Sequence, residues 1–370
     1  MCRLNAQLVH LIAAARPNFM KVAPLYHELA RSNWCRAHIV HTGQHYDANM
    51  SEAFFRDLRL PEPHHHLEVG SGTHAEQTGR TMIAYERACA AQRPDALIVV
   101  GDVNATAACA LVGAKLGIPV VHLEAGLRSR DRTMPEEINR LVTDAIADLL
   151  WTPSADADAN LRAEGIPAQR IDCIGNIMID SFEMLRERIS AAGTRESLGL
   201  MARPYALVTL HRPANVDRRE SLTELVVTLI EIARDIDVVF AIHPRTRKRL
   251  AEFALLERLS ANPRIHAIEP LGYIEFMNLV LQARIAITDS GGVQEETTYL
   301  GIPCATVREN TERPITVTLG TNRLLKPAAL PGAVRAALAG DWPRGQPPPL
   351  WDGHTAVRAA HSLLQFLKDR

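Results

Sequence analysis

The chain has 370 residues, and 41 lysines and arginines nearly balance 42 aspartates and glutamates, which leaves a formal net charge of −1. This balance argues against partners that bind mainly through charge, such as nucleic acid or an anionic membrane. No stretch approaches the roughly 18 consecutive apolar residues that a membrane-spanning helix needs. The length predicts two domains. Six cysteines without a C-x-x-C pair favour reduced thiols and a cytoplasmic location.

Strand and helix patterns alternate in the first half of the chain. The apolar segment 8–15 predicts a first buried strand. Residues 96–100 predict a strand rich in β-branched side chains, residues 105–116 an alanine-rich helix, and residues 118–123 another strand. Strand, helix and strand within about 30 residues form a βαβ unit, which implies a parallel sheet.

The second half repeats this pattern and adds polar residues to it. Three apolar runs each lead directly into a polar cluster, at residues 205–210, 238–242 and 284–288. Ligands of open α/β sheets bind at the carboxyl ends of the strands, where these clusters lie. Continuous apolar strands also indicate that helices cover both faces of the sheet.

We therefore expect an α/β fold of two doubly wound domains that face each other across a cleft. The N-terminal domain is expected over residues 1–180 and the C-terminal domain over residues 181–355. A final helix over residues 356–370 is expected to pack back on the N-terminal domain.

The strongest single motif is the segment 289–296, where a strand ends and a helix begins after two glycines. With Ser290 before them, Gly291 and Gly292 let backbone N–H groups approach an anion, and the helix N-terminus adds about half a positive charge. The pattern predicts a diphosphate cradle, with Glu296 one turn into the helix to accept hydrogen bonds from ribose hydroxyls. A plain strand–helix turn remains the alternative.

Carboxylates form a second candidate group, in the first half of the chain. Asp102 ends one predicted strand and Glu124 ends the next, and neighbouring parallel strands lie about 4.8 Å apart. Glu136 and Glu137 follow Pro135, which suits the first turn of a helix. Several carboxylates in one pocket suit general acid–base catalysis. The alternatives are helix capping for Glu136 and Glu137, and hydrogen-bonded loop acids for the other two.

Basic residues follow predicted strands in both halves, at Arg16, Lys21, His211 and Arg212, and Arg313 lies in the segment 312–314. Beside a phosphate-type turn, they indicate an anionic ligand. Three consecutive histidines, at 64–66, offer metal-ligand side chains. Consecutive residues cannot all point at one ion, however, and no H-E-x-x-H spacing occurs. We therefore predict no metal site.

Taken in order, these motifs resemble the non-hydrolysing UDP-N-acetylglucosamine 2-epimerase family. Each matching piece is short, but the ordered set is specific and spans most of the chain. The pieces are Arg16-Pro17 with Lys21 and Ala23-Pro24, Thr42-Gly43-Gln44-His45, Gly101-Asp102, the segments 122–128 and 135–140, Gly175-Asn176, His211-Arg212, and the segments 289–296 and 311–314.

The resemblance implies the GT-B architecture, two Rossmann-like domains with the active site in the cleft between them and UDP mainly on the second. It implies a homodimer, a UDP-sugar substrate, and neither cofactor nor metal. Phe276 is expected near the uracil, with a position in a helix core as the alternative. The candidate substrate-binding residues are Arg16, Lys21, Arg140, His243, Phe276, Ser290, Gly291, Gly292, Glu296 and Arg313.

The implied reaction is the reversible inversion of carbon 2, which converts UDP-N-acetylglucosamine to UDP-N-acetylmannosamine, and we expect a role in polysaccharide biosynthesis. UDP leaves the anomeric carbon while a base removes the carbon-2 proton, and the 2-acetamidoglucal intermediate then takes UDP and a proton back. The implied catalytic residues are Asp102, Glu124, Glu136 and His211. As an imidazolium, His211 would stabilise the diphosphate leaving group.

Two departures from the family pattern leave the substrate open. Asn18 stands where many members have glutamate, and Ala214 replaces an acid in the segment that follows His211-Arg212. That segment resembles a branch which includes enzymes of diacetamido-uronic UDP-sugars. A 2-epimerase of such a sugar, a hydrolysing 2-epimerase, a GT-B glycosyltransferase and a non-enzymatic nucleotide-sugar sensor are the alternatives.

Overall fold

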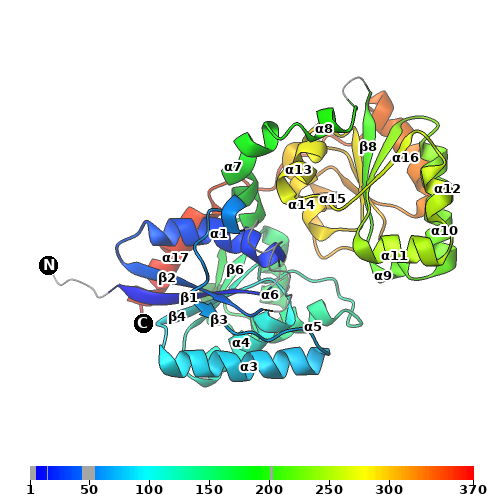
Figure 1. The fold of residues 1–370 in the computed structure, drawn as a ribbon. Coiled ribbons are helices and arrows are strands. Elements are labelled where there is room, and N and C mark those ends of the chain that lie inside the picture. The colour runs from blue at the N-terminus through cyan, green and yellow to red at the C-terminus, as the bar shows by residue number, and fades with distance from the viewer. Residues whose placement is uncertain (1–5, 15, 44–54, 201–202) are drawn as a thin grey trace. The chain divides into compact units, whose positions relative to one another are not determined.

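The computed structural model describes residues 6–14, 16–43, 55–200 and 203–370, without the side chain of Arg16. The chain divides into two compact units (Figure 1), one formed by Met1–Met184 with Pro349–Arg370 and the other by Leu185–Pro348. The predicted boundary at residue 180 and this division both lie within α7 (Ile177–Ser190). Residues 349–355, which the sequence places in the second domain, belong to the first unit.

A seven-stranded parallel sheet forms the centre of the first unit. Its strands are β1 (Gln7–Ala13), β2 (Cys35–His41), β3 (His65–His66), β4 (Ala96–Val100), β5 (Val120–Leu123), β6 (Leu149–Thr152) and β7 (Ile171–Cys173). They lie in the order β3-β2-β1-β4-β5-β6-β7. The order reverses between β1 and β4, and open α/β sheets bind ligands at the carboxyl ends of strands beside such a point.

Helices cover both faces of this sheet. In Figure 1, α1 (Arg16–Ala30) and α17 (Thr355–Lys368) lie on one face and contact each other, and α3 (His74–Ala91), α4 (Asn104–Lys115) and α5 (Pro135–Ile146) lie on the other. The remaining helices of the unit are α6 (Ala155–Ala163) and η1 (Ala168–Arg170). Because both faces are covered, every residue of β4 is buried, which explains its uninterrupted apolar sequence.

The second unit is built on a six-stranded parallel sheet. Its strands are β8 (Tyr205–Thr209), β9 (Asp237–Ala241), β10 (Ile265–Ile268), β11 (Ile285–Thr288), β12 (Cys304–Thr306) and β13 (Asn322–Leu324), in the order β10-β9-β8-β11-β12-β13. Its helices are α8 (Thr194–Ser197), α9 (Pro213–Val216), α10 (Arg219–Ile232), α11 (Pro244–Glu252), α12 (Leu256–Ser260), α13 (Tyr273–Gln282), α14 (Gly291–Leu300), α15 (Ile315–Thr318), η2 (Pro327–Ala329) and α16 (Leu330–Ala339).

Each unit contains the doubly wound strand order that defines the Rossmann fold. The α/β class and the two Rossmann-like domains of the GT-B architecture, predicted from the sequence, are therefore confirmed. The predicted βαβ unit corresponds to β4, α4 and β5. Strand β5 begins later than predicted, because the backbone N–H of Ile118 donates to Gly113 at the end of α4 and Pro119 has no N–H.

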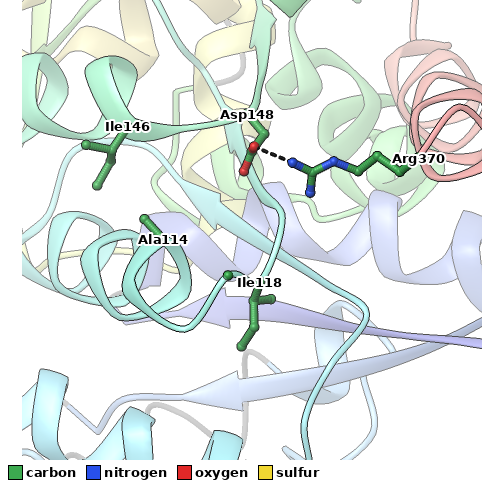
Figure 2. Close-up of a pocket in the computed structure, with 6 residues that line it drawn as sticks. Ala114, Ile118, Ile146, Asp148 and Arg370 are labelled. Atoms are coloured by element: carbon green, nitrogen blue, oxygen red, sulfur yellow. Dashed lines mark hydrogen bonds and ion pairs between the residues drawn. The ribbon is translucent and has the colours of Figure 1, made fainter.

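A surface pocket lies at the amino ends of β5 and β6, opposite the strand ends that carry Asp102 and Glu124. It is lined by Ala114, Gly117, Ile118, Ile146, Asp148 and Arg370 (Figure 2). The Nη2 atom of Arg370 lies 2.6 Å from Oδ1 of Asp148, and Oδ2 of Asp148 accepts a hydrogen bond from the Val120 N–H. The carboxylate therefore joins the C-terminus to the start of β5.

Two further predictions from the sequence concern membrane-spanning helices and the cysteines. Within the described ranges, no helix is long and apolar enough to cross a membrane. The five cysteines in those ranges are free thiols: Cys35, Cys89, Cys109, Cys173 and Cys304. Cys2 lies outside the described residues.

Candidate active site

The carboxyl ends of β4 and β5 bring together a lysine and a glutamate in the first unit. Val100 and Leu123, the last residues of these strands, are register partners, so Gly101 and Glu124 follow side by side. The Nζ atom of Lys21, from α1, pairs with Oε2 of Glu124, and the glutamate side chain is 4% exposed. A Cβ atom on Gly101 would lie 3.3 Å from this carboxylate and 3.5 Å from Lys21 Nζ. Glycine at 101 therefore lets the ion pair pack directly over the strand end.

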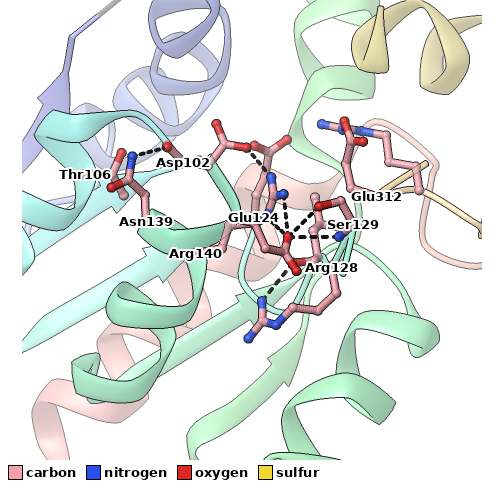
Figure 3. Close-up of polar contacts among 12 residues, drawn as sticks. Asp102, Thr106, Glu124, Arg128, Ser129, Asn139, Arg140 and Glu312 are labelled. Carbon is pink, nitrogen blue, oxygen red and sulfur yellow. Dashed lines mark hydrogen bonds and ion pairs between the residues drawn. The ribbon is translucent and has the colours of Figure 1, made fainter. Parts of the chain in front are cut away.

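Asp102, the next residue, is held by a buried arginine (Figure 3). The Arg140 Nη1 atom lies 2.5 Å from Oδ2 of Asp102, and the Arg140 Nη2 atom lies 2.7 Å from Oε2 of Glu137. Glu137 also accepts hydrogen bonds from the backbone N–H groups of Ser129 and Arg130. Burial raises the pKa of Glu137, but the hydrogen bonds from Arg140 and these backbone groups outweigh it and hold the pKa below its ordinary value. An ionised Glu137 thus fixes Arg140, while Asp102 keeps 33% of its side chain exposed.

Glu136 and Glu137 occupy different environments although they are neighbours. Glu136 is exposed on the first turn of α5, whereas Glu137 is buried against Arg140. Which of two adjacent helix-start acids is buried depends on what packs beside the helix, and the sequence does not give this. The assignment of Glu136 to catalysis stays a prediction.

A buried histidine contacts the backbone at the end of β4. His122, in β5, lies with its Nδ1 2.6 Å from Oδ1 of Asp144 and its Nε2 2.8 Å from the carbonyl oxygen of Gly101. Asp144 also contacts Arg128, whose Nη1 lies 2.7 Å from Oδ2. Sequence analysis missed Asp144 and the role of His122, although a histidine within an apolar strand was a visible signal. Together they hold Gly101, and with it Asp102, in place.

Asn18, one of the departures from the family pattern, binds two strand ends. Its Oδ1 atom accepts a hydrogen bond from the Ala14 N–H, and its Nδ2 atom donates to the Val100 carbonyl. The side chain therefore joins the ends of β1 and β4, where the strand order reverses. Arg16, Gln44 and His45, also matched by motif, cannot be placed in this way, because the side chain of Arg16 and all of Gln44 and His45 lie outside the described residues.

In the second unit, an aspartate at the end of β11 positions a histidine. Asp289 is completely buried, and its Oδ1 atom lies 3.0 Å from Nδ1 of His211. It also accepts hydrogen bonds from the Arg212 N–H and from Nδ2 of Asn215. Burial raises the pKa of Asp289, but these partners, His211 first, outweigh it and lower the pKa overall. The carboxylate fixes the Nδ1 side of His211, whose ring is 38% exposed. Asp289 stood in the quoted motif, but the sequence did not reveal this role.

His243 lies beside this pair. The ring centroids of His211 and His243 are 5.4 Å apart, and Nδ1 of His243 accepts a hydrogen bond from the Arg245 N–H at the start of α11. Burial, and then the neighbouring His211, lower the pKa of His243. The structure thus brings the two histidines together, because they follow β8 and β9, which are neighbouring strands.

The glycine turn leads into α14 as predicted. Ser290 is the N-cap residue, and Gly291 and Gly292 form the first turn, which contains no acidic side chain. A Cβ atom on Gly292 would meet no atom within 4 Å. One on Gly291 would lie 2.5 Å from Nη1 of Arg313. The first turn therefore combines a positive helix end with open space above Gly292, which suits an anion.

Arg313 and Phe276 occupy positions that the sequence did not predict in detail. The Nε atom of Arg313 lies 2.7 Å from Oε1 of Glu295, and its Nη1 atom lies 2.6 Å from Oε1 of Glu312. Two buried carboxylates thus fix this guanidinium behind Gly291. Phe276 is partly buried, and it packs against the small apolar cluster formed by Ala286, Val293 and Cys304. Direct contact of either residue with a nucleotide stays a prediction.

Glu296 is buried in α14, where the Tyr273 hydroxyl donates a 2.8 Å hydrogen bond to its Oε1 atom. Burial raises the pKa of Glu296 to about 8, although the hydrogen bond from Tyr273 acts to lower it. In the unliganded protein the side chain is therefore largely a neutral carboxylic acid at pH 7. Sequence analysis named Glu296 but not Tyr273.

A stability measurement tests the state of Glu296. Because its pKa is higher in the folded than in the unfolded chain, protonation stabilises the fold below about pH 4.5, and this contribution is lost as pH rises through about 8. As pH rises from 5 to about 8, we expect the unfolding free energy of the unaltered protein to fall by a few kcal/mol relative to that of Glu296→Gln. Urea unfolding at several pH values measures this, with the exposed Glu275→Gln as a control. A difference that is independent of pH would contradict the prediction.

Fold and sites together define a two-unit Rossmann-like α/β protein with carboxylate–cation pairs at the strand ends of one unit and a glycine-rich helix start in the other. The chain belongs to the UDP-N-acetylglucosamine 2-epimerase family, whose model matches residues 27–364. It is 45% identical over 325 residues to UDP-N-acetylglucosamine 2-epimerase of Methanocaldococcus jannaschii, with 85% of this chain and 87% of the relative covered. It is 40% identical over 318 residues to UDP-2,3-diacetamido-2,3-dideoxy-D-glucuronate 2-epimerase of Pseudomonas aeruginosa, with the same shares covered.

Solved structures agree with this assignment. The crystal structure of the Methanocaldococcus jannaschii enzyme in complex with UDP-GlcNAc and UDP superimposes with a TM-score of 0.87 at 42% identity, covering 97% of this chain and 99% of that one. The enzyme of Neisseria meningitidis bound to UDP-GlcNAc also gives a TM-score of 0.87, at 25% identity, with 97% and 100% covered. The family predicted from the sequence motifs is thus confirmed.

Proposed function

We propose that this protein is a non-hydrolysing 2-epimerase that interconverts UDP-N-acetylglucosamine and UDP-N-acetylmannosamine. The observation that carries the proposal is the pair of carboxylates, Asp102 and Glu124, on neighbouring strand ends and each held by its own cation. Two further observations support it: a chain-long relationship to an enzyme of this name at 45% identity, and a glycine turn at the start of α14 that suits a diphosphate.

The reaction needs a base, a stabilised leaving group and an acid. A carboxylate takes the proton from carbon 2, the electrons of that C–H bond form the double bond to carbon 1, and the bond from carbon 1 to oxygen breaks with its electron pair going to UDP. Re-addition reverses these steps, with the proton delivered to the opposite face. Asp102, Glu124 and Glu136 are the proposed proton carriers. The ion pairs with Arg140 and Lys21 hold the carboxylates of Asp102 and Glu124 in place.

The second unit supplies the groups for UDP in this proposal. Backbone N–H groups at the start of α14 face the diphosphate, and His211, as an imidazolium, donates to it from Nε2 as negative charge develops on the leaving group. Asp289 binds Nδ1 of His211 and so leaves Nε2 for the substrate. Glu296 accepts hydrogen bonds from the ribose hydroxyls in this proposal.

Replacing His211 tests its proposed role. We expect His211→Asn to lower kcat by about 100-fold, because a preorganised donor to the leaving group is lost, and to change the affinity for UDP far less. Steady-state kinetics and calorimetric titration with UDP measure the two effects. His361→Asn, an exposed histidine on α17, is the matched control. Full activity of His211→Asn would exclude this residue from the mechanism.

Proton NMR in deuterated water tests the function itself. With UDP-N-acetylglucosamine we expect signals of UDP-N-acetylmannosamine to grow and deuterium to enter carbon 2 of both sugars, because a base exchanges its proton with solvent. UDP and free N-acetylmannosamine as the only products would instead indicate a hydrolysing enzyme. Turnover that requires an added acceptor would indicate a glycosyltransferase.

A second substrate is favoured by one relative. The Pseudomonas aeruginosa protein at 40% identity carries the name of a UDP-2,3-diacetamido-2,3-dideoxy-D-glucuronate 2-epimerase, and the segment after His211-Arg212 resembles that branch, apart from Ala214. The same NMR assay with this uronate decides between the two: a kcat/KM higher for the uronate than for UDP-N-acetylglucosamine would reassign the substrate and leave the reaction type unchanged.

The cellular setting completes the proposal. We infer a cytoplasmic enzyme, and the five free cysteines of the described ranges fit a reducing compartment. We also infer a homodimer that supplies an N-acetylmannosamine donor to polysaccharide biosynthesis. Light scattering of the purified full-length protein tests the oligomeric state.

A further inference from the structure

Three histidines from three adjacent strands gather on one face of the first sheet. His10 in β1 is the register partner of His38 in β2, and His65 in β3 is the partner of Val40. Residues two apart in a strand point to the same face, so His38 and Val40, and with them His10 and His65, share that face. One ring nitrogen from each histidine lies within 4.8 Å of the other two.

Hydrogen bonding within the described residues leaves one buried ring nitrogen of each histidine unsatisfied. The Nε2 atom of His10, the Nδ1 atom of His38 and the Nε2 atom of His65 are buried and have no hydrogen-bond partner there. His10 is completely buried, and its other ring nitrogen, Nδ1, lies 3.3 Å from the hydroxyl of Tyr85. Buried polar atoms are normally paired, so an orphaned nitrogen on each of three clustered histidines requires an explanation.

The charge states of His10 and His38 suit ligation. Burial, and then the neighbouring histidines, lower the pKa of His10 to about 3. Burial, the neighbouring histidines and Arg36 lower the pKa of His38 to about 4. Neutral rings at neutral pH carry the free lone pair that a metal ion binds.

We propose that His10, His38 and His65 bind one divalent transition-metal ion of the zinc type. Three imidazoles without a carboxylate select such an ion over calcium or magnesium, which prefer oxygen ligands. In a tetrahedral zinc site with Zn–N bonds of about 2.0–2.1 Å the nitrogens lie about 3.3 Å apart. The ring nitrogens here lie within 4.8 Å of one another, so metal binding draws them closer together in this proposal. Tyr85 contacts the second nitrogen of His10, the position that commonly orients a ligating imidazole.

In this proposal a water molecule fills the fourth position of the ion, and the role of the ion is to join strands. Strand β3 has only two residues and pairs with β2 at the edge of the sheet. An ion held by His10, His38 and His65 joins this edge strand to β2 and β1. Neither Asp102 nor Glu124 belongs to the ligand set, so the site is separate from the proposed epimerase chemistry. The prediction of no metal site considered only residues 64–66, which follow one another in the sequence. In the sheet, His65 lies beside His10 and His38.

Zinc binding to the full-length, tag-free and chelator-treated protein tests the proposal. We expect one Zn²⁺ per chain by calorimetry and a rise in melting temperature of about 5–10 °C at saturating metal. His38→Gln and His65→Gln are expected to weaken binding at least about 100-fold. The exposed His66→Gln, one residue from the site, is the matched control and is expected to bind as the unaltered protein does.

Cobalt provides a readout of geometry that misfolding cannot imitate. Tetrahedral Co²⁺ gives visible absorption bands, which we expect in the unaltered protein and in His66→Gln but not in His65→Gln, with circular dichroism confirming that all three are folded. Zinc bound equally well by His38→Gln and His65→Gln, or not at all by the unaltered protein, would overturn the proposal. If His211→Asn lost zinc binding instead, the metal would lie at the His211–His243 pair, and the proposal would also be overturned.

Discussion

Asp102→Asn and Glu124→Gln are each expected to lower turnover at least about 100-fold and to leave UDP affinity nearly unchanged. Both changes keep the size of the side chain but remove a proton acceptor. UDP is proposed to bind through the start of α14, in the other unit, so its affinity does not depend on these carboxylates. Initial rates by NMR and calorimetric titration with UDP measure the two quantities.

The two variants should also differ in stability. Glu124 is 4% exposed and pairs with Lys21, so Glu124→Gln leaves the ammonium group without its counter-ion in a largely buried place. Asp102 is one-third exposed, and after Asp102→Asn its partner Arg140 still pairs with Glu137. We therefore expect a larger fall in unfolding free energy for Glu124→Gln than for Asp102→Asn.

An exposed acid provides the control for both variants. Glu86→Gln on α3 removes the same charge away from the strand ends and is expected to keep full turnover. If both Asp102→Asn and Glu124→Gln turned over substrate at the unaltered rate, the proposed acid–base pair would be wrong. If turnover fell in only one variant, the other carboxylate would be a binding group.

The sequence predicts the sheets well because buried parallel strands form nearly continuous apolar runs, which can be recognised directly. The run at 96–100 is apolar throughout and the run at 205–210 is apolar except for Thr209, and each is followed by polar residues that the structure places at a strand end. The family motifs add Asp102, Glu124 and His211 to those ends. Local pattern thus determines where the candidate sites lie.

Partners of these residues could not be predicted, because they come from distant segments. Asp144 beneath His122, Asp289 beside His211 and Tyr273 over Glu296 are separated from their partners by 22, 78 and 23 residues. Each contact depends on how elements pack and not on local periodicity. The histidine cluster of β1, β2 and β3 is similar, since only strand register shows that His65 faces His10.

Gly291 and Gly292 are adjacent in α14, but replacing them should have different consequences. In Gly291→Ala the new methyl group would lie 2.5 Å from Nη1 of Arg313 and 2.9 Å from Oε1 of Glu312. That arginine is fixed by two buried carboxylates and cannot easily move. We expect a loss of about 1–3 kcal/mol in unfolding free energy, as for other overpacked sites, together with weaker UDP binding.

Gly292→Ala has no such clash, because no atom lies within 4 Å of the added methyl group. Its stability should be unchanged or slightly higher, since alanine is favoured over glycine in a helix. The methyl group would, however, occupy the space through which the proposed diphosphate approaches the backbone N–H groups, so UDP affinity should fall at least about 10-fold. Gly332→Ala in α16, which also meets no atom within 4 Å, is the matched control for both measurements. UDP bound by Gly292→Ala as tightly as by the unaltered protein would mean that the diphosphate does not lie at the start of α14.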